Sequence, residues 1–174
     1  MPTHKSYKTQ FKHIPYAYIK MTMTIKLGQL RHPDVIALLA EHHADMLKHS
    51  PQESVHALDL SKLEADDISF WTLWINNELA GCCALKALSH EHGEIKSMRT
   101  SAKFLRQGVA KQLLIHLIEQ AKQRAYKHLS LETGTADAFK PAHHLYQQFG
   151  FQPCQPFAHY QADPYSMFMT KNLC

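Results

Sequence analysis

The 174-residue sequence has no apolar stretch long enough to cross a membrane. A membrane-spanning helix needs roughly 18 consecutive apolar residues, and no run approaches that length. The apolar core of a secretion signal is also missing, because Lys5, Lys8, Lys12 and Lys20 interrupt the N-terminal segment. We therefore expect a cytoplasmic protein without a membrane partner.

Cysteine is scarce, and no two cysteines form a Cys-x-x-Cys pair. The four are Cys82, Cys83, Cys154 and Cys174. With no targeting signal toward an oxidising compartment, we expect reduced thiols. Histidine is abundant, at 14 residues, yet its two adjacent pairs point about 100° apart on a helix and cannot share one ion. We predict no metal site.

The excess of positive charge is confined to one end of the chain. The formal net charge is +4, and residues 1–20 contain four of the 19 lysines and arginines but no acid, which leaves 15 bases against 15 acids. A balanced remainder gives no reason to expect a nucleic-acid partner. We expect residues 1–20 to be a flexible basic extension and residues 21–174 to be the folded domain. Met21 and Met23 leave open whether the extension belongs to the mature protein.

Apolar patterning predicts one α/β (α+β) domain with a mixed β-sheet flanked by helices. Alternating or branched apolar residues predict strands over 23–27, 68–75, 79–85, 94–100, 128–133, 151–154 and 166–170. A first helix is expected to begin at His32-Pro33-Asp34 and to end before Ser50-Pro51. Further helices are expected near 61–64, over 109–126 and over 141–148.

The start of the longest predicted helix has the features of a phosphate-binding site. It reads Arg106-Gln-Gly-Val-Ala110 and follows a predicted strand. The first amides of a helix lack internal partners and carry the positive end of its dipole. Gly108 removes a side chain where a phosphate would approach, and Arg106 and Lys111 add positive charge. The segment matches neither the P-loop nor the GxGxxG dinucleotide pattern.

Two segments together resemble a known family. The stretch from Met98 to Leu114 resembles the coenzyme A motif of the GNAT family of N-acetyltransferases, and the stretch from Ala142 to Phe151 resembles its closing Leu-Tyr…Gly-Phe signature. The resemblance implies a single GNAT-type domain that uses acetyl-CoA as co-substrate. One departure is that the family's first polar residue falls at Leu105, whereas this chain has Arg106 one place later.

The resemblance also implies which residues bind the cofactor. The backbone of β-strand residues would pair with the pantetheine arm, and helix-start amides would hold the pyrophosphate. These residues are Met98, Arg99 and Thr100 for the arm, and Arg106, Gln107, Gly108, Val109, Ala110 and Lys111 for the pyrophosphate.

Acetyl transfer to an amine needs a base, because a lysine-like amine has a pKa of about 10.4. Glu94 lies six residues before Thr100, where family members with a glutamate base place it, and we expect it on the strand face of Met98. The competing interpretation is that Glu94 forms a structural ion pair with a neighbouring lysine or arginine across the sheet. Glu132, His92 and an ordered water remain alternative bases.

Tyr146 belongs to the closing signature, where the family's tyrosine reaches the coenzyme sulfur and protonates it. The competing interpretation is a core aromatic that covers the sheet.

The acceptor site is implied by the fold of the family, in which the loop between the first two helices and the final hairpin shape the pocket. This indicates Glu53, His56 and Tyr160, with Ser54 and Tyr165 beside them.

The leading hypothesis is direct transfer of an acetyl group to a small amine or amino-acid-like acceptor, by a monomer or a homodimer. No cysteine occupies a motif position, which argues against an acetyl-enzyme. A coenzyme A-binding regulatory or degenerate module without turnover is the second hypothesis. Acetylation of a protein lysine or N-terminus is the third.

Overall fold

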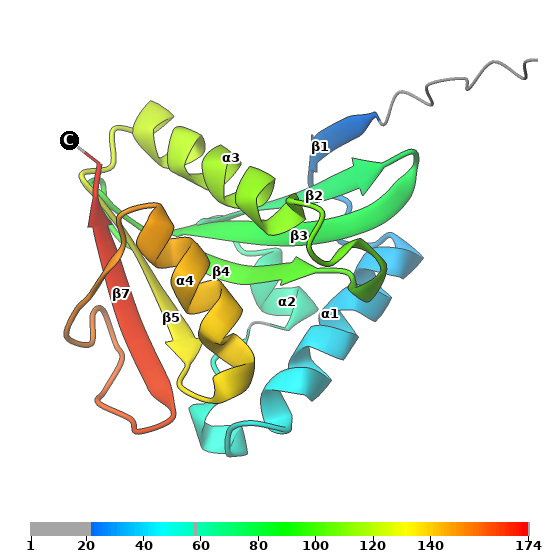
Figure 1. Cartoon of the computed structure of the whole chain (residues 1–174). Coiled ribbons are helices and arrows are strands. Elements are labelled where there is room, and N and C mark those ends of the chain that lie inside the picture. The colour runs from blue at the N-terminus through cyan, green and yellow to red at the C-terminus, as the bar shows by residue number, and fades with distance from the viewer. Residues whose placement is uncertain (1–21, 58, 174) are drawn as a thin grey trace, which may run out of the picture.

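The strands and helices lie close to the predicted ranges in a computed structural model that describes residues 22–57 and 59–173 (Figure 1). The strands are β1 (Met23–Leu27), β2 (Ile68–Ile75), β3 (Glu78–Ala87), β4 (His92–Thr100), β5 (His128–Gly134), β6 (Gln152–Pro153) and β7 (Ser166–Asn172). The helices are α1 (Pro33–Leu47), α2 (Leu60–Leu63), α3 (Val109–Gln123) and α4 (Lys140–Gln148). Short 3₁₀ turns cover Gln52–Ser54, Ala102–Phe104 and Asp137–Phe139. The predicted extension, residues 1–20, lies outside the described residues.

All seven strands belong to one mixed sheet, in the order β1-β2-β3-β4-β5-β7-β6. In the described part of the chain, β4 and β5 are the only parallel pair, with α3 in the connection between them. The β2–β3 hairpin turns at Asn76 and Asn77, whose φ angles of 49° and 66° are left-handed. Asparagine tolerates that conformation, so the predicted turn forms there. The fold class expected from the sequence is confirmed.

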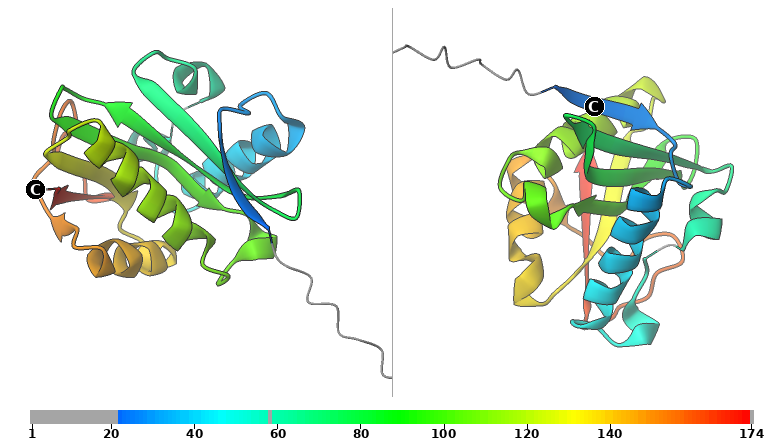
Figure 2. Two further views of the ribbon diagram at one scale, coloured as in Figure 1. Left: turned by 90° about the horizontal axis from the view of Figure 1, so that it is seen from above. Right: turned by 90° about the vertical axis from the view of Figure 1, so that its right-hand side faces the viewer.

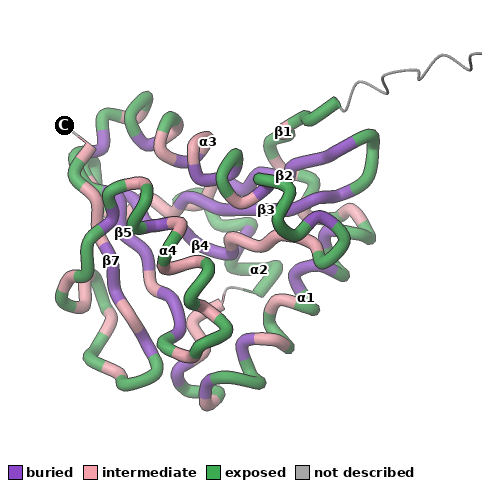
Figure 3. The backbone as a smooth tube through the Cα atoms, viewed as in Figure 1, coloured by how far each residue is buried: buried purple, intermediate pink, exposed green. Residues whose placement is uncertain are grey.

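Helices cover both faces of the sheet, with α3 and α4 on one face and α1 and α2 on the other (Figure 2). The central strands are therefore buried along most of their length (Figure 3). Burial on both sides explains why β2 reads as a nearly continuous apolar run. Alternate residues of β2 and β3 enter two separate cores. Trp71, Leu73, Cys83 and Leu85 belong to the core under α3 and α4, and Phe70, Trp74, Cys82 and Ala84 belong to the core under α1 and α2.

The two parallel strands pair over a short stretch and then diverge. Their register runs from His92 opposite His128 to Ile95 opposite Leu131, and no pairing follows among the described residues. Figure 1 shows β4 and β5 spreading apart beyond this point. The sheet therefore opens in its middle, with α4 on one side of the opening.

A β-bulge in β4 accompanies the divergence. Ser97 and Met98 stand where β3 has the single residue Cys83, and Ser97 has a left-handed φ of 48°. An extra residue bends a strand and changes which face the following side chains point to. Met98 accordingly packs against the α3–α4 core, whereas Glu94 lines a cavity on the other face. The expectation that Glu94 and Met98 share a strand face was wrong, because strict alternation ignores the bulge.

Gly81 fixes how closely α3 approaches the sheet. A Cβ atom on this residue would lie 2.6 Å from the carbonyl oxygen of Arg99 and 2.9 Å from Cγ1 of Val109, the first residue of α3. Such distances do not occur for ordinary Cβ contacts, so the start of α3 rests directly on β3 only because residue 81 has no side chain.

We predict that Gly81→Ala lowers the free energy of unfolding by about 1–3 kcal/mol, because the added methyl group overfills this contact. Chemical denaturation checks this, with Glu119→Ala on the exposed side of α3 as the control. Equal stability of the two variants would show that α3 has room to move.

Candidate active site

The start of α3 presents unpaired backbone donors. Gln112 is the first residue of the helix whose amide is bonded, to the Gly108 carbonyl at 3.0 Å. No described residue accepts a hydrogen bond from the amides of residues 106–111. Gly108 has a left-handed φ of 81°, and nothing lies within 4 Å of where its Cβ would be. An anion can therefore approach these amides without meeting a side chain on Gly108.

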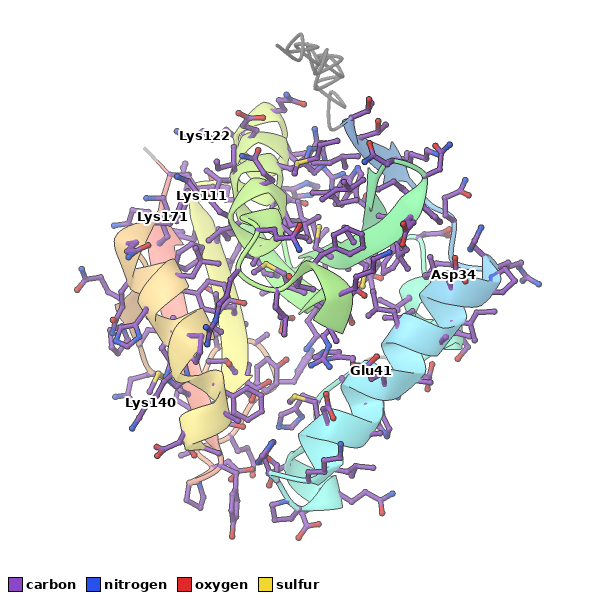
Figure 4. The ribbon with its side chains drawn as sticks, turned by 45° about the vertical axis from the view of Figure 1, so that its right-hand side comes forward. Asp34, Glu41, Lys111, Lys122, Lys140 and Lys171 are labelled. Atoms are coloured by element: carbon purple, nitrogen blue, oxygen red, sulfur yellow. The ribbon has the colours of Figure 1, made fainter. Side chains whose placement is uncertain are left out.

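The charge around this helix start is favourable for an anion. Arg106 and Lys111 are exposed, and Val109 directs its side chain into the core, so it can offer only its backbone. Figure 4 shows the labelled lysines on one side of the molecule and the labelled acids on the other. Lys111 and Lys122 lie on α3, Lys140 on α4 and Lys171 on β7, while Asp34 and Glu41 lie on α1. Leu105, at the departure from the family motif, is 58% exposed.

Beyond Ile95, no described residue pairs with β4 on the side from which β5 has departed. On the other side it still pairs with β3, with Thr100 opposite Gly81. The side chain of Met98 packs against the core, and Arg99 forms ion pairs with acids of α1. Met98 and Arg99 can therefore contact a cofactor chiefly through their backbone groups. This part of β4 resembles the open edge of a sheet.

Tyr146 lies on α4 and is 6% exposed, with its ring 5.7 Å from the ring of Phe151. Burial, followed by the nearby Cys83 and Glu132, raises the pKa of Tyr146 above the ordinary tyrosine value. The hydroxyl therefore keeps its proton and is a donor, and no described residue is hydrogen-bonded to it. Glu132 is the first β5 residue beyond the last pair with β4. Tyr146 thus packs as a core aromatic and also has a free donor near the opening of the sheet.

A cavity of about 630 Å³ lies on the opposite face of the sheet from α4. It is lined by the segment after α1, by residues of α2, β3 and β4, and by the loop before β7. The structure brings together four residues that the sequence indicated, namely Glu53, His56, Glu94 and Tyr160. Ser54 is buried and Tyr165 is 44% exposed, and neither lines the cavity.

Glu94 is held at the sheet side of this cavity by a lysine and a tyrosine. The Tyr160 hydroxyl donates to Glu94 Oε1 at 2.5 Å, and Lys96 Nζ lies 3.1 Å from the same oxygen. Lys96 also donates to the Tyr160 oxygen at 2.6 Å. Burial and then Glu94 raise the pKa of Tyr160, which therefore remains the protonated donor. No described residue is hydrogen-bonded to Glu94 Oε2.

Lys96 was missed by the sequence reasoning. Glu94 and Lys96 are two residues apart on one strand, and residues at that spacing share a face, so their pairing was readable from the sequence. Their side chains are 4% and 8% exposed. Glu94 therefore forms an ion pair, but with a lysine of its own strand and not, as the competing interpretation had it, with a residue across the sheet.

The alternative bases have other partners. Glu132 accepts a hydrogen bond from Ser166 Oγ at 2.7 Å, and burial raises the pKa of Glu132. His92 Nε2 lies 2.7 Å from Ser130 Oγ, and burial lowers the pKa of His92. Neither residue lines the cavity.

The fold is that of the GNAT acetyltransferases. The model of the Acetyltransferase (GNAT) family matches residues 35–151. The uncharacterized N-acetyltransferase YsnE of Bacillus subtilis is 56% identical over 151 residues, which cover 87% of this chain and all of the relative. The uncharacterized N-acetyltransferase YedL of Escherichia coli is 49% identical and covers 87% of this chain and 95% of its own length. The chain therefore belongs to the GNAT acetyltransferase family.

Solved structures agree. A Klebsiella pneumoniae protein assigned as an acyl-CoA N-acyltransferase is 32% identical, with a TM-score of 0.73 over 87% of this chain and 98% of that one. A GNAT family acetyltransferase from Elizabethkingia anophelis with acetyl-CoA bound has the same fold, with 24% identity and a TM-score of 0.62 over 86% of this chain and 97% of that one.

Residues 22–57 and 59–173 contain neither a candidate membrane-spanning helix nor a candidate metal site. None of their helices has the length and apolar character needed to cross a membrane. Their histidine, cysteine, aspartate and glutamate side chains form no group of three that could hold a metal ion.

We predict that Lys96→Met lowers the free energy of unfolding by about 3–5 kcal/mol, because it leaves the Glu94 carboxylate buried without its counter-charge. The double variant Glu94→Gln/Lys96→Met should recover much of this loss. Urea denaturation of both variants and of Glu94→Gln checks the coupling. Strictly additive effects would mean that the two side chains do not depend on each other.

Proposed function

We propose that the protein transfers an acetyl group from acetyl-CoA directly to the amino group of a small amine or amino-acid-like acceptor. The observation that carries this proposal is the position of Glu94. Its carboxylate lies at the wall of a cavity large enough for a small molecule, beside the point where the sheet opens. The opening lies between this cavity and the face of the sheet covered by α3 and α4, where the free amides of α3 lie.

The cofactor would be bound by backbone groups. The amides of residues 106–111 would hold the pyrophosphate, and the free edge of β4 from Met98 to Thr100 would pair with the pantetheine arm. Support comes from the unpaired donors at Gly108 and from the Elizabethkingia relative of the same fold, which has acetyl-CoA bound. The arm would then end at the opening between β4 and β5, close to Tyr146.

The two oxygens of Glu94 would have separate tasks. Oε1 is occupied by Tyr160 and Lys96, which fix the carboxylate, while Oε2 is left for the acceptor. Oε2 would take a proton from the acceptor ammonium. The neutral nitrogen would then form a bond to the acetyl carbon, the carbon–sulfur bond would break, and the Tyr146 hydroxyl would give its proton to the departing sulfur. The second proton, which the acetylated nitrogen loses as it becomes an amide, would restore the Tyr146 hydroxyl.

Release of free thiol from acetyl-CoA with a panel of amines tests the proposal. We expect that thiol is released only when an acceptor is present. We also expect that the product exceeds the amine acceptor in mass by one acetyl group. Tight binding of acetyl-CoA without turnover would favour a coenzyme A-binding module instead. Peptides that are acetylated faster than every small amine would favour protein acetylation.

We predict that Gly108→Glu abolishes acetyl-CoA binding, because it puts bulk and negative charge where the pyrophosphate would lie. Gly108→Ala is the matched control, since it imposes the same left-handed strain while its Cβ meets no neighbouring atom. Thermal unfolding with and without acetyl-CoA checks this. Full stabilisation of the glutamate variant by acetyl-CoA would contradict the assigned phosphate site.

We predict that Tyr146→Phe lowers kcat by about 10²–10⁴-fold while acetyl-CoA binding persists, because only the proton donor is lost. The hydroxyl has no hydrogen bond to a described residue, so the free energy of unfolding should hardly change. Steady-state kinetics and a thermal midpoint check both statements. An unchanged kcat would leave Tyr146 with a packing role alone.

A further inference from the structure

We infer that the acceptor carries a carboxylate beside its amino group, as an amino acid does, and that Lys86 binds this carboxylate. The inference rests on the proposed acetyl transfer and selects one acceptor class for it. It starts from the charged groups that line the cavity next to Glu94.

Lys86 lies directly opposite Glu94 in the sheet. The two residues are register partners on the antiparallel strands β3 and β4, and both line the cavity. Directly opposite residues on one face have Cβ atoms about 4.5–5.5 Å apart. A cation therefore stands beside the carboxylate that would take the proton from the acceptor.

Lys86 has capacity for a further partner. Its Nζ atom is 3.8 Å from Asp67 Oδ2, too far for a hydrogen bond, and its side chain is 33% exposed. Within residues 22–57 and 59–173 no acceptor is hydrogen-bonded to this ammonium. Lys96, by contrast, already contacts Glu94 and Tyr160. Lys62, the third lysine of the cavity, is 66% exposed and pairs with Asp59 of its own helix cap.

The formal charges that line the cavity balance. Three lysines, Lys62, Lys86 and Lys96, face three acids, Glu53, Glu94 and Asp163. A zwitterion has no net charge and matches such a lining. A simple amine would bring its ammonium next to Lys86 with no negative group of its own, and the two cations would repel each other.

One acceptor orientation satisfies both neighbouring groups. The ammonium of an amino acid would approach Glu94 Oε2, and its carboxylate would accept hydrogen bonds from Lys86 Nζ across the β3–β4 pair (Figure 1). Bonds between an ammonium and a carboxylate are stronger than neutral ones, which would place the amino group in the same position at each turnover.

Matched acceptors test the inference with the full-length protein. Thiol release is measured for several free amino acids, for their carboxamides and for the corresponding decarboxylated amines. The free amino acids should have the highest kcat/KM. Lys86→Met should lower kcat/KM for the amino acids by about 10–100-fold, mostly through KM, because one charge-assisted bond is lost. For the decarboxylated amines the same variant should leave kcat/KM unchanged or raise it.

Lys122→Met is the control, since Lys122 lies on α3 (Figure 4) and does not line the cavity. Thermal midpoints establish that both variants fold. An equal loss for amino acids and decarboxylated amines would overturn the role of Lys86. Release with decarboxylated amines but not with amino acids would overturn the inference and leave the proposed transfer standing. Release with none of the acceptors would overturn both.

Discussion

The separation of β4 from β5 is the constraint on which the arrangement of the site depends. Parallel neighbours in a sheet normally stay paired, but here pairing ends at Ile95 and Leu131, just before the bulge at Ser97. The opening leaves one backbone edge of β4 free and puts Tyr146 on one side of the sheet and Glu94 on the other. A continuous sheet would separate those two groups completely. In the proposed function, the cofactor side and the acceptor side meet at this opening.

The α3 side and the cavity side of the sheet stabilise negative charge in different ways. On the α3 side, backbone amides and exposed lysines favour an anion, so little depends on a single side chain. On the cavity side, a carboxylate is buried, which is costly unless it is paired and hydrogen-bonded. Lys96 and Tyr160 meet that requirement on one oxygen of Glu94 and leave the other free. Tyr160 reaches Glu94 from the loop before β7, where it packs against Phe157 and Phe168, so folding of that loop and assembly of the site are linked.

Most elements were predictable because their local patterns agree with their final environments. Three local patterns each specify one structure: the apolar run over 68–75, the two asparagines of the hairpin, and the apolar stripe over 109–126. The bulge was not predictable, since a serine at position 97 gives no sign of a left-handed conformation. The prediction that Met98 shares a strand face with Glu94 was wrong for this reason. The ion pair of Glu94 with Lys96 follows from strand alternation and was overlooked. Glu53, His56 and Tyr160 came from the family resemblance, because nothing local shows that distant loops meet; their roles, like those of Tyr146 and residues 106–111, remain predictions.

A crystal structure of the protein with coenzyme A is the most direct measurement of the central claim. We expect a pyrophosphate within hydrogen-bonding distance of the amides around Gly108, a pantetheine arm paired with β4 from Met98 to Thr100, and the sulfur atom at the opening beside Tyr146. A coenzyme bound elsewhere, with the opening between β4 and β5 filled by side chains, would contradict it.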